Sequence, residues 1–365
     1  MPKTNNFDLI RLAAALQVAL MHAVYLFGVT SRQWPLHLIT DLFPGVPVFF
    51  FISGLLISHS FERNPSLRDF ARNRCLRIYP ALVVCFAVSV AAVWASGYLE
   101  GVHSTVSAWV KWTLAQLSIA QFYNPAFMRQ YGMGILNAST WTISIELQFY
   151  ALIPVLYGVL RLRRLPRARS NAVLLSVGLL SLLVNVVWEH ALDHSRTLFA
   201  YLGLSCLPWL YMFLAGVLAQ RNFAVMHRLL GGRFIPLAAL YCVLALFAAR
   251  VLHWRFDNSL NPIVFAGLAL VTFAAAFTAP SLADRLLRRN DLSYGVYLYH
   301  APLINLLLFT GAAAGLSGLA LTMAVTFALA AASWWLIERP ALGLRRHPLY
   351  SHQPAAISDA ARGVT

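Results

Sequence analysis

Charged residues are scarce in this chain of 365 amino acids, where they make up 11% of the sequence. An ordinary soluble domain carries about 25%. Hydrophobic residues account for 59% of the chain. The shortage of charge excludes a soluble globular domain of this length and indicates a protein that lies in a bilayer.

Cysteine is also rare, and its four residues follow no recognisable spacing. Cys75 lies beside a basic loop, whereas Cys85, Cys206 and Cys242 lie within apolar runs. Neither paired spacing nor a metal-ligand pattern is present, so we expect no structural disulfide and no metal site.

Acidic residues are few as well, with 13 Asp and Glu against 28 Lys and Arg and a net charge of +15. Such a charge can indicate a nucleic-acid partner. Here the basic residues lie mostly in short loops between apolar runs, where they set membrane topology. We therefore expect the lipid bilayer, and no nucleic acid, as a partner.

Apolar runs recur along the chain at about 17–25 residues, the length that crosses a bilayer as an α-helix. We predict an all-α polytopic membrane protein with ten transmembrane helices, at residues 8–28, 44–61, 78–97, 141–160, 171–188, 200–220, 234–250, 262–280, 293–310 and 316–338. The segment 105–122 is less apolar, and we interpret it as an interfacial or re-entrant helix.

Most Lys and Arg fall on one side of the membrane when these ten helices alternate, and both termini share that side. By the positive-inside rule, both termini are predicted to be cytoplasmic. Asp8 and Arg11 interrupt the first apolar region, so we expect it to remain as the first span instead of a cleaved signal peptide. Residues 1–340 are predicted to form the transmembrane domain and 341–365 a disordered cytoplasmic tail.

The first predicted helix carries three ionisable side chains on one stripe. At about 3.6 residues per turn, Asp8, Arg11 and His22 fall on the same face. Ionisable groups are costly in hydrocarbon, so such a face usually points at a cavity. Taken alone, His22 could equally be a packing residue near the far interface.

Arginines cluster at the start of the third predicted helix, at Arg72, Arg74 and Arg77. One interpretation is ordinary positive-inside loading of a loop. The other is a guanidinium site for phosphates, either of a nucleotide-bearing cofactor or of anionic lipid headgroups.

Polar residues also interrupt the helix predicted at 141–160, where Thr142, Glu146 and Tyr150 share one face. From the helix rise, we expect Glu146 and His22 to lie at a similar depth in the outer half of the membrane. The alternative is a structural glutamate bonded to a neighbouring helix. Ser53 precedes a glycine that would allow close helix packing.

A second histidine, His300, shares a stripe with Tyr297 on the ninth predicted helix. It could instead bond a backbone carbonyl freed by Pro302. At the end of the last helix, Glu338 and Arg339 are interpreted as an ion pair that terminates the helix.

Six motifs in order between residues 7 and 340 resemble the acyltransferase-3 family of membrane acyltransferases: FDLIRLAAALQVALMH, GVPVFFFISGLLI, RNRCLRIYPAL, WTISIELQFY, SYGVYLYHAPL and IERP. The resemblance implies an acyl-CoA co-substrate, no permanently bound cofactor, and a carbohydrate acceptor that is usually acetylated on a hydroxyl. By position, the family's essential histidine falls on His22, its helix-one arginine on Arg11, and its Arg-x-Arg pair on Arg72 and Arg74.

The resemblance thus implies a multi-pass O-acetyltransferase of the bacterial inner membrane. We expect His22 to act as general base on the acceptor hydroxyl, with Glu146 orienting it or balancing its charge. The acyl-CoA phosphates would bind Arg11, Arg72, Arg74 and Arg77. Possible substrate-cavity residues are Ser53, Trp141, Tyr150, Tyr297 and His300.

A secondary transporter or flippase for a lipid-linked sugar is the alternative. The sequence leaves open the acceptor, the acyl length, the oligomeric state and whether the acyl group passes through a covalent intermediate.

Overall fold

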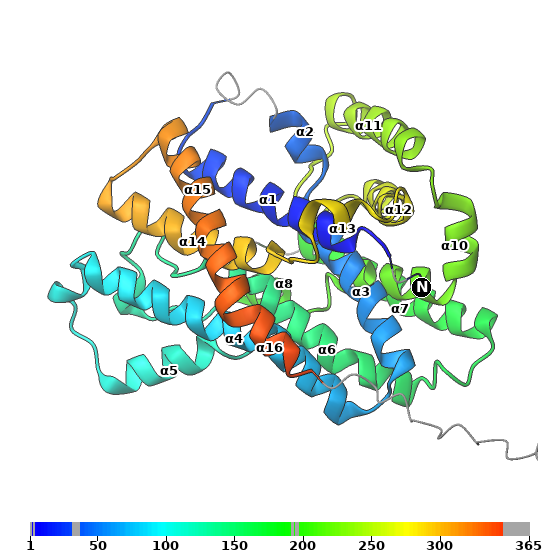
Figure 1. The fold of residues 1–365 in the computed structure, drawn as a ribbon, viewed down its shortest axis with the longest axis horizontal. Helices are drawn as coiled ribbons and strands as arrows, with labels where there is room; N and C mark the ends of the chain where they lie inside the picture. Colours follow the sequence, from blue (N-terminus) through cyan, green and yellow to red (C-terminus); the bar gives the residue numbers. More distant parts are fainter. Residues whose placement is uncertain (1, 3, 31–36, 191–192, 194–196, 346–365) are drawn as a thin grey trace, which may run out of the picture.

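Every regular element in the described part of the chain is a helix (Figure 1). The computed structural model describes residues 2, 4–30, 37–190, 193 and 197–345. The helices are α1 (Phe7–Leu26), α2 (His37–Leu42), α3 (Gly45–Arg63), α4 (Leu67–Ala95), α5 (Val106–Gln116), α6 (Trp141–Val159), α7 (Arg167–His190), α8 (Thr197–Gly203), α9 (Leu210–Arg221), α10 (Phe223–Leu230), α11 (Phe234–Arg250), α12 (Pro262–Phe277), α13 (Leu282–Leu287), α14 (Ser293–Thr310), α15 (Gly315–Ser333) and α16 (Arg339–Gly343). A π-helical turn, Trp334–Glu338, joins α15 to α16.

Six helices in the described part are long and apolar enough to cross a membrane, and α10 with α11 make a seventh if this pair, bent by 85°, is one span. The protein is therefore a multi-pass membrane protein. Ten spans are not confirmed. The segment predicted at 200–220 is broken into α8 and α9, α12 has only 16 residues, and α14 carries several polar residues along its 18.

Hydrogen bonds join helix ends that an alternating arrangement would place on one side. Before α1, the side-chain amide of Asn6 donates to the carbonyl of Thr278, just beyond α12, at 2.8 Å. Near the ends of α3 and α9, Glu62 pairs with Arg221 at 2.7 Å, and the Tyr157 hydroxyl of α6 donates to the same carboxylate. The cytoplasmic location of the termini remains a prediction.

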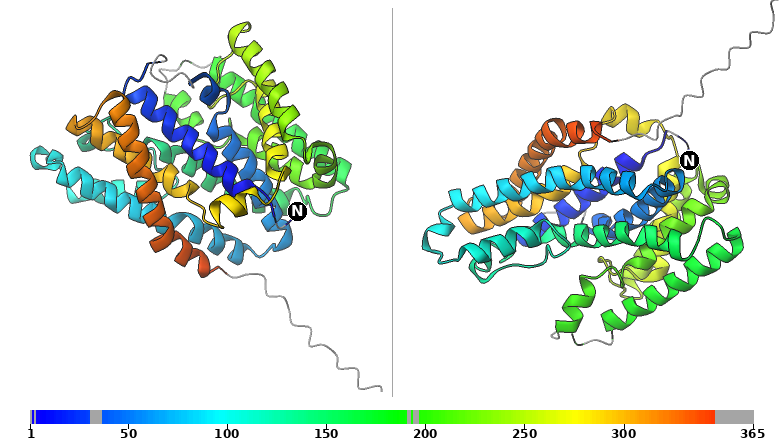
Figure 2. Two further views of the ribbon diagram at one scale, coloured as in Figure 1. Left: turned by 45° about the horizontal axis from the view of Figure 1, so that its top comes forward. Right: turned by 90° about the horizontal axis from the view of Figure 1, so that it is seen from below.

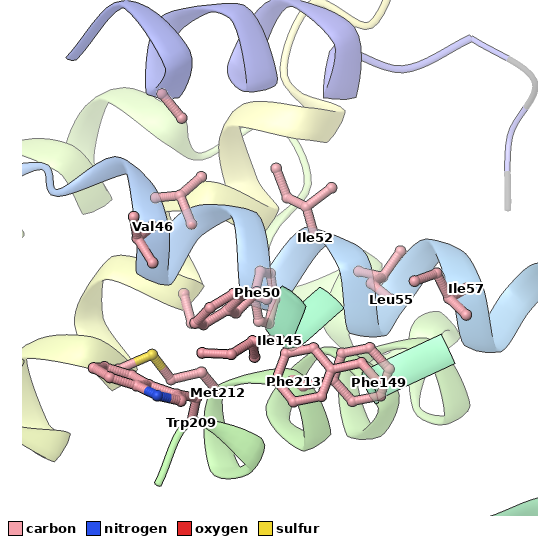
Figure 3. Close-up of a cluster of buried hydrophobic side chains, with 14 of the residues drawn as sticks. Val46, Phe50, Ile52, Leu55, Ile57, Ile145, Phe149, Trp209, Met212 and Phe213 are labelled. Atoms are coloured by element: carbon pink, nitrogen blue, oxygen red, sulfur yellow. The ribbon is translucent and has the colours of Figure 1, made fainter. Parts of the chain in front are cut away.

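The helix α3 runs through the middle of the core, with α6 and α9 against it (Figures 2 and 3). Phe149 and Phe213 stack beside it with ring centroids 4.4 Å apart. Gly54 lies so close to the backbone of Phe213 that an added Cβ would clash with it, and Gly216 lies equally close to the backbone of α3. The close packing that the sequence predicted beside Ser53 is therefore confirmed.

Three smaller predictions concern the segment 105–122, the cysteines and the C-terminal tail. The segment 105–122, predicted to be an interfacial or re-entrant helix and not a span, contains α5, a helix of 11 residues at one edge of the molecule (Figure 1). The four cysteines are free thiols. Of the tail predicted to be disordered, residues 341–343 form the end of α16 and residues 344 and 345 follow it, whereas 346–365 lie outside the described residues.

Candidate active site

The packing of α1 against α14 brings together two histidines that are far apart in the sequence. The Nδ1 atom of His22 lies 3.0 Å from the Nε2 atom of His300. His300 is fully buried, and His22 is half-buried. On its other side, the Nδ1 atom of His300 lies 3.1 Å from the carbonyl oxygen of Val296. Sequence reasoning identified each histidine but not their contact.

The backbone determines which nitrogen of each neutral ring carries the proton. A carbonyl can only accept, so Nδ1 of His300 donates to Val296 and its Nε2 presents a lone pair. The Nδ1 atom of His22 then has to donate to that lone pair. This leaves Nε2 of His22 unprotonated, which is the form that a general base needs.

The carbonyl that Pro302 leaves free belongs to Leu298, four residues earlier. It accepts a hydrogen bond of 2.9 Å from the side-chain amide of Asn137. The proposal that His300 satisfies this carbonyl is therefore wrong. His300 uses the carbonyl of Val296 and is left free to hold His22.

A cavity of about 110 Å³ lies between α1, α3, α4, α6 and α14. The early turns of α1 and α4 supply its arginines, Arg11, Arg74 and Arg77, and α6 supplies Thr142. The polar residues in its wall are Arg11, Ser53, Arg74, Arg77, Thr142, Glu146, Tyr150, Ser293, Tyr294 and Tyr297, and the remaining wall is apolar. Such a cavity suits a long ligand with an anionic end and a mainly apolar arm.

Glu146 does not contact His22 in this structure, contrary to what we expected. Its carboxylate accepts hydrogen bonds from the Ser53 hydroxyl at 3.1 Å and the Tyr150 hydroxyl at 2.5 Å. The position beside His22 that we assigned to Glu146 is held by His300. Ser53 and Tyr150 both line the cavity, as the sequence predicted.

A carboxylate that sequence reasoning missed, Asp291, organises the arginines. Its side chain lies 2.6 Å from Arg77 and 3.6 Å from Arg11, and it accepts a hydrogen bond of 2.5 Å from the Ser293 hydroxyl. Burial alone would raise the pKa of Asp291, but the guanidinium groups of Arg77 and Arg11 and the bonds from Ser293 hold it below its ordinary value. In the sequence, the feature that could have identified Asp291 is its place as a lone carboxylate directly before an apolar run.

Arg74 completes the basic wall. Its guanidinium carbon lies 5.5 Å from the ring centroid of Tyr150, and its buried Nε has no hydrogen-bond partner among the described residues. The buried Nε of Arg11 likewise has no hydrogen-bond partner among the described residues. The wall therefore keeps unused donors, which anionic oxygens would satisfy.

The last described residue, Arg345, belongs to the same basic region. Burial, together with the neighbouring charges of Arg77 and Arg74, lowers the pKa of Arg345 to about 10. Arg72 does not line the cavity. It donates to the carbonyl of Leu344 at 3.0 Å, at an exposed position. The structure thus groups three of the four predicted anion-binding arginines and separates Arg72 from them.

Glu338, the last residue of the π-helical turn, also lies beside this region. Its carboxylate accepts a hydrogen bond of 3.0 Å from Ser333 and lies 3.9 Å from Arg77. Arg339 instead lies over the ring of Trp335, 4.6 Å from its centroid. The predicted ion pair between Glu338 and Arg339 is therefore wrong.

Tyr297 stands between the cavity and the histidine pair. Its hydroxyl lies 2.5 Å from that of Thr142, and its ring centroid lies 5.9 Å from that of His300. Tyr297 lines the cavity, whereas His22 and His300 lie behind it. Trp141, also predicted for this cavity, lines a separate recess instead.

These features define a membrane protein with a basic, partly apolar cavity beside a fixed histidine pair. The family model described as an acyltransferase domain matches residues 4–338. The chain therefore belongs to the acyltransferase-3 family, and it is an acyltransferase.

Two relatives resemble the chain over most of both lengths. Nodulation protein 10 of Rhizobium leguminosarum bv. viciae is 32% identical over 358 residues, which cover 93% of this chain and 94% of that protein. The O-acetyl transferase of Shigella phage Sf6 is 27% identical over 354 residues, with 93% and 96% covered. The peptidoglycan O-acetyltransferase OatA of Listeria monocytogenes serovar 1/2a is 25% identical over 330 residues, covering 82% of this chain and 51% of that protein. No solved structure matches the chain.

Proposed function

We propose that this protein moves an acyl group, normally acetyl, from acyl-CoA to a hydroxyl of a cell-envelope or exported carbohydrate. The observation that carries the proposal is the contact between His22 and His300, which leaves the Nε2 atom of His22 as an unprotonated base. The O-acetyltransferase names of the relatives from phage Sf6 and Listeria support the reaction, and the peptidoglycan of the latter supports a carbohydrate acceptor.

The donor is proposed to bind in the cavity, with its phosphates at the basic wall. Arg11, Arg74 and Arg77 line that wall, and in the described part of the chain the buried Nε atoms of Arg11 and Arg74 have no hydrogen-bond partner. Guanidinium groups suit phosphate oxygens because their donors are planar and always charged. Ser53 and Glu146 lie farther along and offer polar contacts to the amide-containing arm of coenzyme A.

The topology of the proposal follows from the positive-inside rule. The chain crosses the bacterial inner membrane ten times, both termini are cytoplasmic, and the arginine wall opens to the cytoplasm. Acyl-CoA then acts as a co-substrate that enters from inside, while the acceptor approaches from the opposite side.

In the chemical step, Nε2 of His22 takes the proton of the acceptor hydroxyl while its oxygen attacks the thioester carbonyl. The carbon–oxygen bond forms, the carbon–sulfur bond breaks, and the leaving thiolate of coenzyme A recovers the proton from His22. Proton abstraction of this kind contributes about 10²–10⁴-fold in rate. His300 acts through His22 by holding its tautomer and ring orientation.

The first test is coenzyme A release from acetyl-CoA by the purified protein in lipid nanodiscs, supplied with envelope glycans as acceptor. His22→Ala should lower the rate about 100-fold or more, because the base is lost. His103→Ala, at an exposed position, is the matched histidine control and should retain the rate of the unaltered protein. Mass spectrometry of the glycans should show the acetyl group only where coenzyme A is released.

Retained transfer by a well-folded His22→Ala protein would refute the proposed base. A proton-coupled carrier would release no coenzyme A at all, so the same assay separates the enzyme from the transporter alternative.

A further inference from the structure

A second hollow, of about 550 Å³, lies where α6 begins and α7 ends. Three tryptophans line it: Trp141, Trp188 and Trp209. The polar residues Asp257 and Asn258, from the loop before α12, complete the wall. We call this hollow the tryptophan recess.

The indole rings of the recess are held in place by neighbouring groups. The ring of Trp209 lies 5.3 Å from that of Trp141 and 5.2 Å from that of Trp188, measured between centroids. The indole N–H groups of Trp188 and Trp209 donate to backbone carbonyls of Phe199 and Gly203, each at 2.9 Å. Trp209 is 3% exposed and Trp188 is 9% exposed. Tryptophans of an interfacial belt face headgroups singly, whereas these form a wall.

The polar groups at the recess keep unused hydrogen-bonding capacity. The indole N–H of Trp141 and the side-chain amide of Asn258 have no hydrogen-bond partner among the described residues. The carboxylate of Asp257 accepts one backbone bond, from Ser259 at 2.8 Å, and keeps its other oxygen. Hydrogen-bond donors and hydrogen-bond acceptors are thus both available beside the aromatic wall.

The tryptophan recess adjoins the wall of the acyltransferase cavity. Trp141 lines the recess, and the next residue, Thr142, lines the cavity. The ring of Trp209 lies 6.1 Å from that of Phe50, which also lines the cavity. Thr142 lies beside Tyr297, away from the arginine wall. The recess therefore lies near the part of the site where an acceptor, and not the donor phosphates, has to arrive.

From these observations we infer that the tryptophan recess is a binding subsite for a sugar ring of the acceptor glycan, an inference that rests on the proposed function. A pyranose ring has an apolar C–H face that packs on an indole, and its rim of hydroxyls needs both donors and acceptors. Stacking would fall to Trp141, while the buried ring of Trp188, itself stacked on Phe199 with centroids 4.9 Å apart, supports the wall behind it. Hydrogen bonding would fall to Asp257 and Asn258. The subsite would position the glycan while one of its hydroxyls reaches His22.

The test uses a printed array of bacterial oligosaccharides and polysaccharides, probed with the full-length protein in nanodiscs without sugar-headgroup detergent. Trp141→Ala and Asn258→Ala should each weaken binding to the glycans that the unaltered protein binds, by about tenfold, which corresponds to about 1.4 kcal/mol. The affinity for acetyl-CoA should not change. Trp94→Ala is the matched tryptophan control, because Trp94 is 73% exposed and belongs to α4.

Two results would overturn the inference: an unaltered protein that binds no glycan on the array, or recess variants that bind glycans as the unaltered protein does. The Asn258→Ala variant guards against misfolding, because this side chain lies on a loop and makes no hydrogen bond to any residue that the structure describes. Failure of the proposed function would appear separately, as absence of coenzyme A release from the unaltered protein with any glycan bound on the array.

Discussion

His300 illustrates how a buried side chain can set the chemistry of another residue. One of its ring nitrogens is engaged by the carbonyl of Val296, and the other faces His22. The backbone of α14 therefore specifies the proton position on a side chain of α1. His300 is a positioning residue in this arrangement, because it meets the substrates only through His22.

This arrangement predicts different outcomes for two substitutions of His300. In His300→Gln the side-chain oxygen can still accept from Nδ1 of His22, whereas His300→Leu removes that acceptor. We expect His300→Leu to lower kcat by about 10–10³-fold, which is part of the rate enhancement that a general base contributes. The KM for acetyl-CoA should not change. His300→Gln should restore part of kcat.

Steady-state kinetics of coenzyme A release would measure both effects. Equal losses in the two variants would show that His300 serves packing alone.

The sequence predicted single residues better than it predicted their partners. The helical period placed His22, Glu146 and His300 on polar stripes, and the structure retains those stripes. Which stripe faces which depends on how α1, α6 and α14 pack, and no local pattern contains that information. The assignment of Glu146 to His22 failed for this reason, since helix rise gives depth but not the rotation of one helix about its neighbour.

Among the helices, the pairing of α3 with α9 depends on two glycines. Gly54 contacts the backbone of α9, and Gly216 contacts the backbone of α3. Within a membrane such close approach replaces the hydrophobic effect as a source of helix association, because backbone atoms gain van der Waals contact. α3 also carries Ser53 and Phe50 of the cavity wall, so this packing positions the site.

Replacing Gly54 by Ala should destabilise the protein by about 1–3 kcal/mol, because the added methyl group has to displace the α9 backbone. Gly178→Ala is the control, since a Cβ there meets no atom within 4 Å in the interior of α7. Thermal unfolding in nanodiscs would compare the two. A Gly54→Ala protein as stable as the Gly178→Ala protein would contradict this packing.

The prediction of membrane spans from hydropathy was least accurate where the helices are short or interrupted. The apolar run at 200–220 continues through residues 204–209, which join α8 to α9 without helical structure. Hydropathy measures how residues partition between water and lipid, but it does not register a break in the backbone. Conversely, α14 lies in a predicted span although Tyr297, His300 and Asn305 make it polar, because these side chains face other helices.

For the molecule as a whole, Asp291 links three helices at the arginine wall. It holds Arg11 of α1 and Arg77 of α4 at the start of α14. Because the pKa of Asp291 is lower in the folded protein than in the unfolded chain, the carboxylate stabilises the fold at every pH above its unfolded value of about 3.9. That contribution is lost as the pH falls through the lower, folded pKa.

Asp291→Asn should therefore destabilise the protein near neutral pH, on the order of 3 kcal/mol, because Arg77 loses its closest buried partner. The difference from the unaltered protein should shrink as the pH falls below about 3.9. Unfolding measured across this pH range would test the sign. Asp284→Asn is the control, because its pair with Arg289 is exposed and contributes about 0–1 kcal/mol. A difference between Asp291→Asn and the unaltered protein that grows in acid would contradict this account.

The phenol ring of Tyr297 forms part of the wall of the arginine-lined cavity and lies against His300, with ring centroids 5.9 Å apart. A thioester resting in the cavity, with the donor phosphates among the arginines, would not meet the base until that ring turned. Wasteful hydrolysis of the donor would then be confined to the moments when the ring is turned aside. An enzyme built in this way can remain charged with its activated group while it waits for a scarce alcohol to arrive.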